Sequence, residues 1–95
     1  MGAATFHTVI EAHTSREAFQ EALLNDEFQK EEYITIKLPL GEDPWVFSQR
    51  LIDTNDQRID SKWGPAGCID ITKTAYAIGS GARSNSFLFF GWEPT

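Results

Sequence analysis

Two stretches of the chain alternate between apolar and polar side chains. In residues 5–12 (TFHTVIEA), the side chains of Phe6 and Ile10 fall on one face together with Thr8. Residues 33–38 (YITIKL) alternate in the same way, and the following proline ends the pairing because it has no amide proton to donate. A period of two residues is typical of a half-buried strand, so both stretches are predicted to be β-strands.

Between these strands, the sequence carries the start signal and the apolar spacing of a helix. Thr14 and Glu17 form a capping box, in which the Thr14 hydroxyl accepts from the Glu17 amide. Apolar residues follow at helical spacing as far as Leu23, and Asn25 is a suitable C-terminal cap. A strand, a helix and a strand in succession are compatible with a right-handed crossover, if the two strands are parallel.

Residues 44–53 fit two different structures. Asp43 and Pro44 are suited to begin a helix, as its N-cap and its first residue. The aromatic and β-branched side chains of the segment instead favour a strand. We therefore predict a strand here, followed by a hairpin loop at 54–57 and a returning strand at 58–60, with the helix as the alternative.

The last third of the chain combines two further strands with a loop. Residues 68–72 are predicted to be a strand, which residues 75–78 extend or pair with. Residues 79–86 are polar and rich in glycine, which is typical of a flexible loop. Residues 87–92 (FLFFGW) form an apolar run without alternation, as expected of a strand that is covered on both faces.

Together these segments predict the α+β class: a small single domain with a four- to five-stranded, mostly antiparallel sheet and one main helix packed on one face. Residues 1–4 are expected to be a disordered start or an expression remnant, and residues 5–95 to form the domain. One helix covers only one face of such a sheet. The strand at 87–92 would then need a second cover, either a long loop such as 53–67 or another copy of the chain, so we expect a homo-oligomer.

Charge and composition narrow the possible partners and the location. The net charge of −6 over 95 residues disfavours direct nucleic-acid binding, because a polyanion would be repelled. No apolar run reaches 18 residues, so no membrane span is expected. Cys68 is the single cysteine, which excludes an internal disulfide and fits a reducing, cytoplasmic location.

The residue types that catalysis or metal binding requires are scarce. His7 and His13 are too few to form a metal site without acidic ligands from elsewhere. Cys68 opens an apolar strand, where we expect a buried structural thiol rather than a nucleophile. Because no nucleophile, base and orienting group can be assembled, we expect a non-catalytic protein without a metal or cofactor.

Two kinds of binding surface remain as hypotheses. The first is a protein-interaction module that docks a partner, or another copy of itself, through an acidic helix or an aromatic C-terminal surface; its residues are Glu17, Glu21, Phe87, Phe89 and Trp92. The alternative is a binder of a small anionic ligand, phosphorylated or nucleotide-like, that backbone amides and an arginine fork would hold. Its predicted residues are Gly79, Gly81, Arg83, Ser84, Asn85 and the ring of Trp63.

Overall fold

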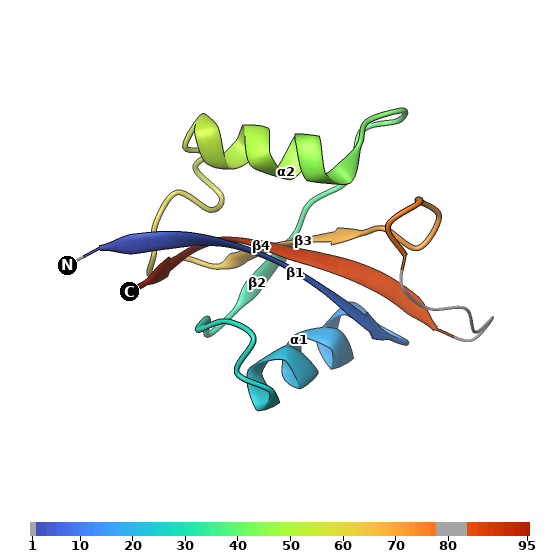
Figure 1. The fold of residues 1–95 in the computed structure, drawn as a ribbon, viewed down its shortest axis with the longest axis horizontal. Coiled ribbons are helices and arrows are strands. Elements are labelled where there is room, and N and C mark those ends of the chain that lie inside the picture. The colour runs from blue at the N-terminus through green and yellow to red at the C-terminus, as the bar shows by residue number, and fades with distance from the viewer. Residues whose placement is uncertain (1, 78–83) are drawn as a thin grey trace.

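The computed structural model describes residues 2–77 and 84–95 of the chain. Its elements, in chain order, are β1 (Ala3–Ala12), α1 (Ser15–Leu24), β2 (Tyr33–Thr35), α2 (Pro44–Asp53), β3 (Ala66–Asp70) and β4 (Asn85–Pro94) (Figure 1). The α+β class is confirmed, with four strands in one mixed sheet. β1 includes Ala3 and Ala4, which were predicted to precede the domain.

The predicted helix between the first two strands is present, and its ends follow the predicted capping signals. The Thr14 hydroxyl accepts from the backbone N–H of Glu17 at 3.1 Å. The Glu17 carboxylate in turn accepts from the same hydroxyl at 3.3 Å. At the other end, the N–H of Asn25 donates to the carbonyl of Glu21 at 3.1 Å. Local hydrogen bonds therefore define both ends of α1.

The prediction of a strand at residues 44–53 is wrong, because this segment is the helix α2. The Asp43 carboxylate accepts from the backbone N–H groups of Trp45 at 2.9 Å and Val46 at 3.1 Å. Phe47 and Leu51, one helical turn apart, are both buried. The N-cap and this apolar stripe outweigh the weak β-propensity of the individual side chains, which tertiary context readily overrides.

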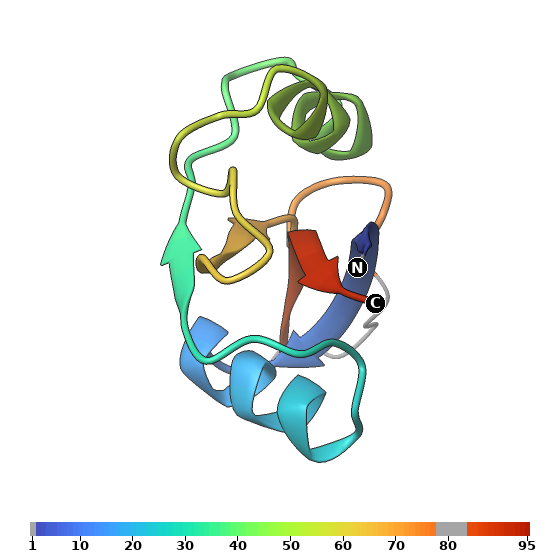
Figure 2. The ribbon, with the colours of Figure 1, turned by 90° about the vertical axis from the view of Figure 1, so that its left-hand side faces the viewer.

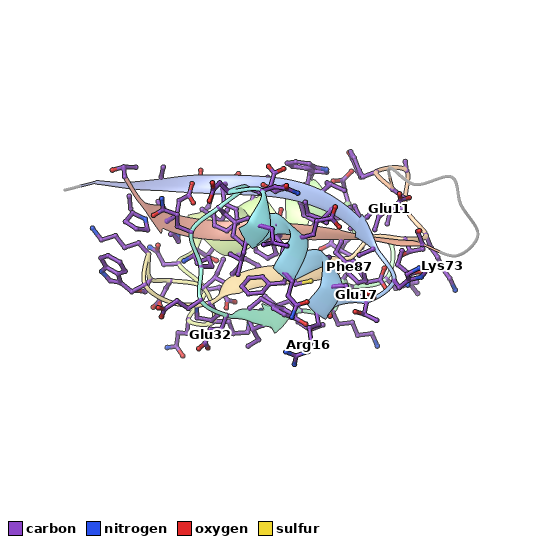
Figure 3. The ribbon with its side chains drawn as sticks, turned by 90° about the horizontal axis from the view of Figure 1, so that it is seen from below. Glu11, Arg16, Glu17, Glu32, Lys73 and Phe87 are labelled. Carbon is purple, nitrogen blue, oxygen red and sulfur yellow. The ribbon has the colours of Figure 1, made fainter. Side chains whose placement is uncertain are left out.

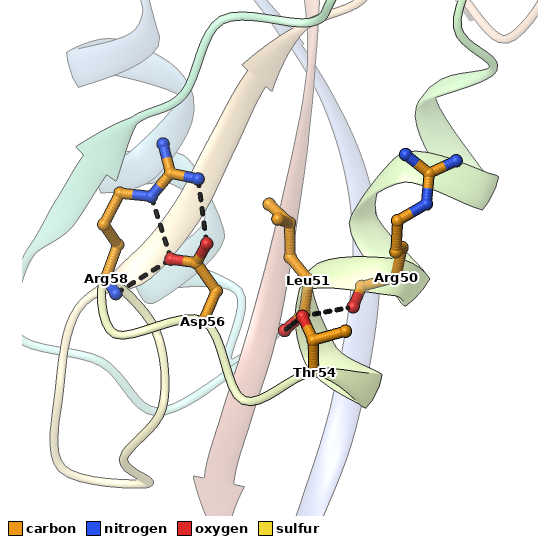
Figure 4. Close-up of polar contacts among 5 residues, drawn as sticks. All are labelled: Arg50, Leu51, Thr54, Asp56 and Arg58. Carbon is orange, nitrogen blue, oxygen red and sulfur yellow. Dashed lines mark hydrogen bonds and ion pairs between the residues drawn. The ribbon is translucent and has the colours of Figure 1, made fainter.

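The strand predicted at 58–60 is also wrong, because the chain after α2 forms turns (Figure 4). The Thr54 hydroxyl donates to the Arg50 carbonyl at 2.8 Å, which closes the last turn of the helix. The Asp56 carboxylate accepts from the Nε atom of Arg58 at 2.9 Å and from its backbone N–H at 3.0 Å. These short-range bonds satisfy the backbone locally. Residues 75–77 likewise form a turn and do not extend β3.

The strands lie in the order β1-β4-β3-β2. β4 is antiparallel to both of its neighbours, whereas β2 is parallel to β3, so β1, β2 and β3 all run in one direction. The chain first moves from β1 across the sheet to β2 and then returns to β3. Because such connections are right-handed, this reversal places α1 and α2 on opposite faces (Figure 2).

Two helices, one on each face, replace the single helix that the sequence predicted, and they bury residues 87–90 of the apolar run in β4. Phe89 packs beneath α1 against Phe19, and Leu88 and Phe90 belong to the cluster on the α2 face. The second cover, expected from a loop such as 53–67 or from another copy of the chain, is therefore α2 itself. Phe87 and Phe89, at 6% and 0% exposed, lie in the core and offer no surface to a partner.

Candidate functional site

Trp63 stands out among the described aromatic residues, because 77% of its surface is exposed. It lies in the loop before β3, between Lys62 and the Gly64-Pro65 pair. The ammonium group of Lys62 lies 5.6 Å from the centre of the Trp63 ring, a cation–π arrangement. The sequence predicted Trp63 as a binding residue, and the structure places its ring in solvent.

Lys30 holds the loop that presents Trp63. Its Nζ atom donates to the backbone carbonyls of Ser61 at 3.3 Å, Lys62 at 3.1 Å and Gly64 at 2.9 Å. An ammonium group has three protons, so these carbonyls satisfy it fully. The side chain is only 6% exposed, and this burial lowers the pKa of Lys30, an effect that the Glu93 carboxylate partly opposes.

A hollow of about 420 Å³ adjoins the Trp63 ring. Leu23 and Asp26, at the end of α1, line it from one side, and Lys62 and Pro94 also contribute. We call this surface the Trp63 hollow. It joins two of the predicted elements, the exposed tryptophan and the acidic helix, which are about 40 residues apart in the sequence.

The predicted interface residues Glu17 and Glu21 are both exposed on α1. Figure 3 shows Arg16, Glu17 and Glu32 on the α1 side of the molecule. Residues 16–32 contain two basic side chains, Arg16 and Lys30. Because Lys30 points inward to the loop carbonyls, only Arg16 is exposed. The outer surface of the α1 layer is therefore strongly acidic.

Trp92, the remaining predicted interface residue, is only half-buried and packs against the core cluster beneath α2. Its Nε1 atom is buried and has no hydrogen-bond partner among the described residues. Trp92 therefore contributes mainly to the packing of the domain, whereas Trp63 is exposed to solvent.

A larger groove, of about 1030 Å³, lies where β2 and β3 end at their carboxyl termini. We call it the carboxyl-end groove. Asn85, a predicted ligand-binding residue, lines it, and its side-chain amide donates to the His13 carbonyl at 2.8 Å. Ser84 precedes Asn85 and is half-buried. Gly79, Gly81 and Arg83 lie outside the described residues.

The charged side chains of this groove differ in how they are engaged. Its three carboxylates are bound within the protein: Glu42 pairs with Arg50 at 2.9 Å, Asp43 accepts from the hydroxyl of Tyr76 at 2.7 Å, and Asp70 accepts from the backbone N–H of Thr72 at 2.9 Å. The Tyr76 hydroxyl is the main cause that lowers the pKa of Asp43. The ammonium groups of two lining residues, Lys37 and Lys73, have no ion-pair partner among the described side chains.

A serine and a histidine meet beneath α2, but their geometry does not suit nucleophilic catalysis. The Nε2 atom of His7 lies 3.1 Å from the Ser48 hydroxyl. That hydroxyl donates its proton to the Trp45 carbonyl at 3.0 Å, so it accepts from His7 rather than being activated by it. Ser48 is 0% exposed, which keeps substrates away from its oxygen.

Cys68 is equally unsuited to act as a nucleophile. It is 1% exposed in the middle of the sheet, and burial raises the pKa of its thiol to about 12. Among residues 2–77 and 84–95, no group of three or more His, Cys, Asp or Glu side chains is placed to hold a metal ion. In the same part of the chain, neither helix has the length and apolar character needed to cross a bilayer.

Comparison of the chain with protein-family models, curated proteins and solved structures finds no match. Its function must therefore be argued from these surfaces. The role of Lys30 was missed from the sequence because its three acceptors lie 31, 32 and 34 residues away along the chain. No local pattern indicates a contact at that separation.

Proposed function

We propose that this protein is a non-catalytic interaction module, which docks a protein partner on the Trp63 hollow. The observation that carries the proposal is the pairing of an exposed ring with a buried support: Trp63 is 77% exposed, and Lys30 beneath its loop is 6% exposed. Tryptophan residues of this kind, large and held in a fixed place, are prominent among the side chains that contribute most to protein–protein binding.

The way the Trp63 loop is held supports this proposal. Removing a lysine ammonium group from water is costly unless its protons find acceptors. Here the ammonium group of Lys30 donates to three loop carbonyls, at 2.9 to 3.3 Å, on either side of the tryptophan. A loop fixed before binding loses little conformational entropy when a partner covers it, which favours affinity.

Lys62 lines the hollow, but the acidic surface beside it favours a basic partner. Residues 17–32 carry six carboxylates, and their single lysine is turned inward; the carboxylates are Glu17, Glu21, Asp26, Glu27, Glu31 and Glu32. Opposite charge on the partner would steer its approach and raise the association rate. The acidic helix and the tryptophan would then act on the same partner, the first in the encounter and the second in the bound state.

A comparative capture experiment tests the docking role of Trp63. Wild type, Trp63→Ala and Leu40→Ala are used as baits in an extract of the native host, and the affinity of any captured protein is then measured. Leu40 is a matched control because it is a fully exposed apolar residue on the wall of the carboxyl-end groove. We expect Trp63→Ala to weaken binding about 30-fold, as for a hot spot worth roughly 2 kcal/mol, and Leu40→Ala to leave it unchanged. Equal binding by all three baits would refute the proposal.

Association kinetics test the role of the acidic helix separately. In the variant Glu17→Lys/Glu21→Lys, the partner should associate more slowly and depend less on salt, with little change in its dissociation rate. The control is Asp53→Lys at the end of α2, on the opposite face of the sheet. If both variants behave alike, the acidic surface has no steering role.

The carboxyl-end groove supports a second candidate function, the binding of a small anionic ligand. Lys37 and Lys73 are available to an anion, and Asn85 adds a polar side chain. Crevices outside the carboxyl ends of parallel strands are common ligand sites. Thermal-shift screening with nucleotides and sugar phosphates tests this, since a ligand at 100 times its Kd stabilises by about 2.7 kcal/mol. The shift should disappear in the double variant Lys37→Ala/Lys73→Ala. If none of these ligands shifts the melting temperature of the wild type, the second function is wrong.

A further inference from the structure

The outer edge of β1 lacks the features that normally prevent sheets from joining. β1 is an edge strand of 10 residues, and its register with β4 runs without interruption from Ala3–Pro94 to Ala12–Asn85. The strand contains no proline, lysine or arginine and no bulge. At the opposite edge, β2 has only 3 residues and Pro39 follows shortly after. Natural edge strands are usually short, charged, bulged or covered; β2 is short, whereas β1 is long and has a single carboxylate, Glu11, near its end.

The hydrogen-bond pattern shows which backbone groups this edge presents. The N–H of Thr95 donates to the carbonyl of Gly2 at 3.3 Å, so Gly2 faces β4. On the other side of β4, the N–H of Ile71 donates to the carbonyl of Ser86, so Ser86 faces away from β1. Its neighbours in β4 therefore face β1, as the bond between Thr95 and Gly2 also indicates. Because strand residues alternate in direction, the even-numbered residues of β1 face β4 and the odd-numbered ones face outward. The outward residues are Ala3, Thr5, His7, Val9 and Glu11.

We propose that a second copy of this chain pairs with that edge, β1 against β1, about a two-fold axis perpendicular to the sheet. Two four-stranded sheets would then join into one of eight strands. Such an axis keeps each face of the joined sheet on the same side, so both α1 helices cover one face and both α2 helices the other. A symmetric pair of this kind uses the same patch twice and closes at a dimer.

The charge at the edge of β1 allows a second copy to pair there, although the whole chain has a net charge of −6. Glu11 is the one carboxylate in β1. An antiparallel two-fold pair places Glu11 opposite a residue near the start of the other strand and not opposite itself. The two copies therefore meet without directly opposed like charges, which would destabilise the pairing.

The sequence of β1 also selects a register. Residues that lie opposite each other must belong to the same face, so the sum of their numbers is even. Centring the axis on Thr8 sets Phe6 opposite Ile10 of the other copy, both on the α1 face. Aromatic and β-branched residues are a favourable cross-strand pair. Centring it on His7 would set two imidazole rings opposite each other, so we infer the Thr8-centred register.

Sedimentation equilibrium on the full chain tests the dimer, with a matched pair of proline variants. Thr5 and Thr35 are both exposed edge residues. The N–H of Thr5 points away from β4, and that of Thr35 points away from β3, since its neighbour Ile36 donates to Cys68 at 2.9 Å. A proline is tolerated where the missing N–H faces solvent. We expect wild type and Thr35→Pro to be dimers, and Thr5→Pro to be monomeric with at least a 10-fold weaker self-association.

Two further variants test the β1–β1 dimer independently of Thr5→Pro. If Thr5→Pro does not fold, Thr5→Glu sets a carboxylate directly opposite Glu11 of the other copy in the Thr8-centred register and should also give a folded monomer. Thr8→Cys should form a covalent dimer on oxidation, because its non-hydrogen-bonded partner would be Thr8 of the other copy at a Cα distance of about 4.5 Å. A wild type that is monomeric at every concentration, a dimer that survives Thr5→Pro and Thr5→Glu, or a dimer without the Thr8→Cys crosslink would each overturn the proposal. Trp63→Ala should remain dimeric, so loss of partner binding and loss of the dimer are separate results.

Discussion

Phe90 lies directly opposite Gly67 in the β3–β4 ladder, and its ring occupies the space that a side chain at Gly67 would need. A Cβ atom added to Gly67 would lie 2.5 Å from the Cζ atom of Phe90. Phe90 is 0% exposed and packs in the cluster beneath α2, so its ring has no room to move aside. The close contact between β3 and β4 therefore depends on a glycine at this position.

Replacing Gly67 by alanine should lower the free energy of unfolding by about 1–3 kcal/mol, the usual cost of overpacking a core. Chemical denaturation with urea measures this. Gly64→Ala is the control, because a Cβ there would meet its nearest neighbour, the Ser61 carbonyl oxygen, at 3.4 Å, an ordinary contact. Equal stability of the two variants would contradict the steric explanation.

Lys30→Met should loosen the Trp63 loop without unfolding the domain. Methionine keeps the apolar stem of the lysine but leaves three loop carbonyls without their donor. Hydrogen bonds to a charged group contribute about 1.5–3 kcal/mol, so a loss of stability in this range is expected. Hydrogen exchange should become faster in the loop before β3 and remain unchanged in α2.

Lys37→Met is the matched control for that variant, because Lys37 is exposed and has no ion pair among the described residues. It should alter neither stability nor hydrogen exchange. If Lys30→Met behaves like Lys37→Met, the support that we assign to Lys30 is wrong.

His7 should make the protein less stable in mildly acidic solution. Burial lowers the pKa of His7 below its usual 6.5. Between that lowered pKa and 6.5, the unfolded state binds more protons than the folded state, so the free energy of unfolding falls as the pH falls through this window. Above 6.5 the histidine is neutral in both states and has no such effect.

Denaturation at pH 7 and pH 5 tests this effect of His7. His7→Gln retains a donor for the Ser48 hydroxyl, and it should lose less stability between these two pH values than wild type does. His13→Gln, at an exposed position, should behave like wild type. The same loss in all three proteins would exclude His7 as the source.

Cys68 should react with a thiol reagent only when the protein opens. Thiolates are the reactive form, and with a pKa of about 12 and 1% exposure the folded protein presents almost none at pH 8. Labelling in native buffer should therefore proceed at the rate of unfolding, while protein unfolded in urea should react at once. Prompt labelling of the native protein would show that Cys68 is not buried in the sheet.

Where the signals in the sequence are local, they predicted the structure well. Thr14 and Glu17 are three residues apart, and their capping interaction begins α1 as expected. The alternation in residues 5–12 led to β1, because a period of two directly reflects the geometry of an extended chain. The alternation in residues 33–38 led to β2, which is shorter than predicted and ends at Thr35. For α2, the local signals disagreed, and the Asp43 cap proved a better guide than the propensities of the side chains.

The sequence by itself therefore determined the class of the fold, most of its strands and its first helix, since these depend on neighbours a few residues away. Only the tertiary structure decided which faces are covered, because this depends on the path of the chain across the sheet and its return. That path buried Phe87 and Phe89 beneath α1, brought Lys30 under the Trp63 loop, and left the long edge of β1 unpaired among the described residues. Contacts between residues 30 or more positions apart leave no periodic trace in a single sequence.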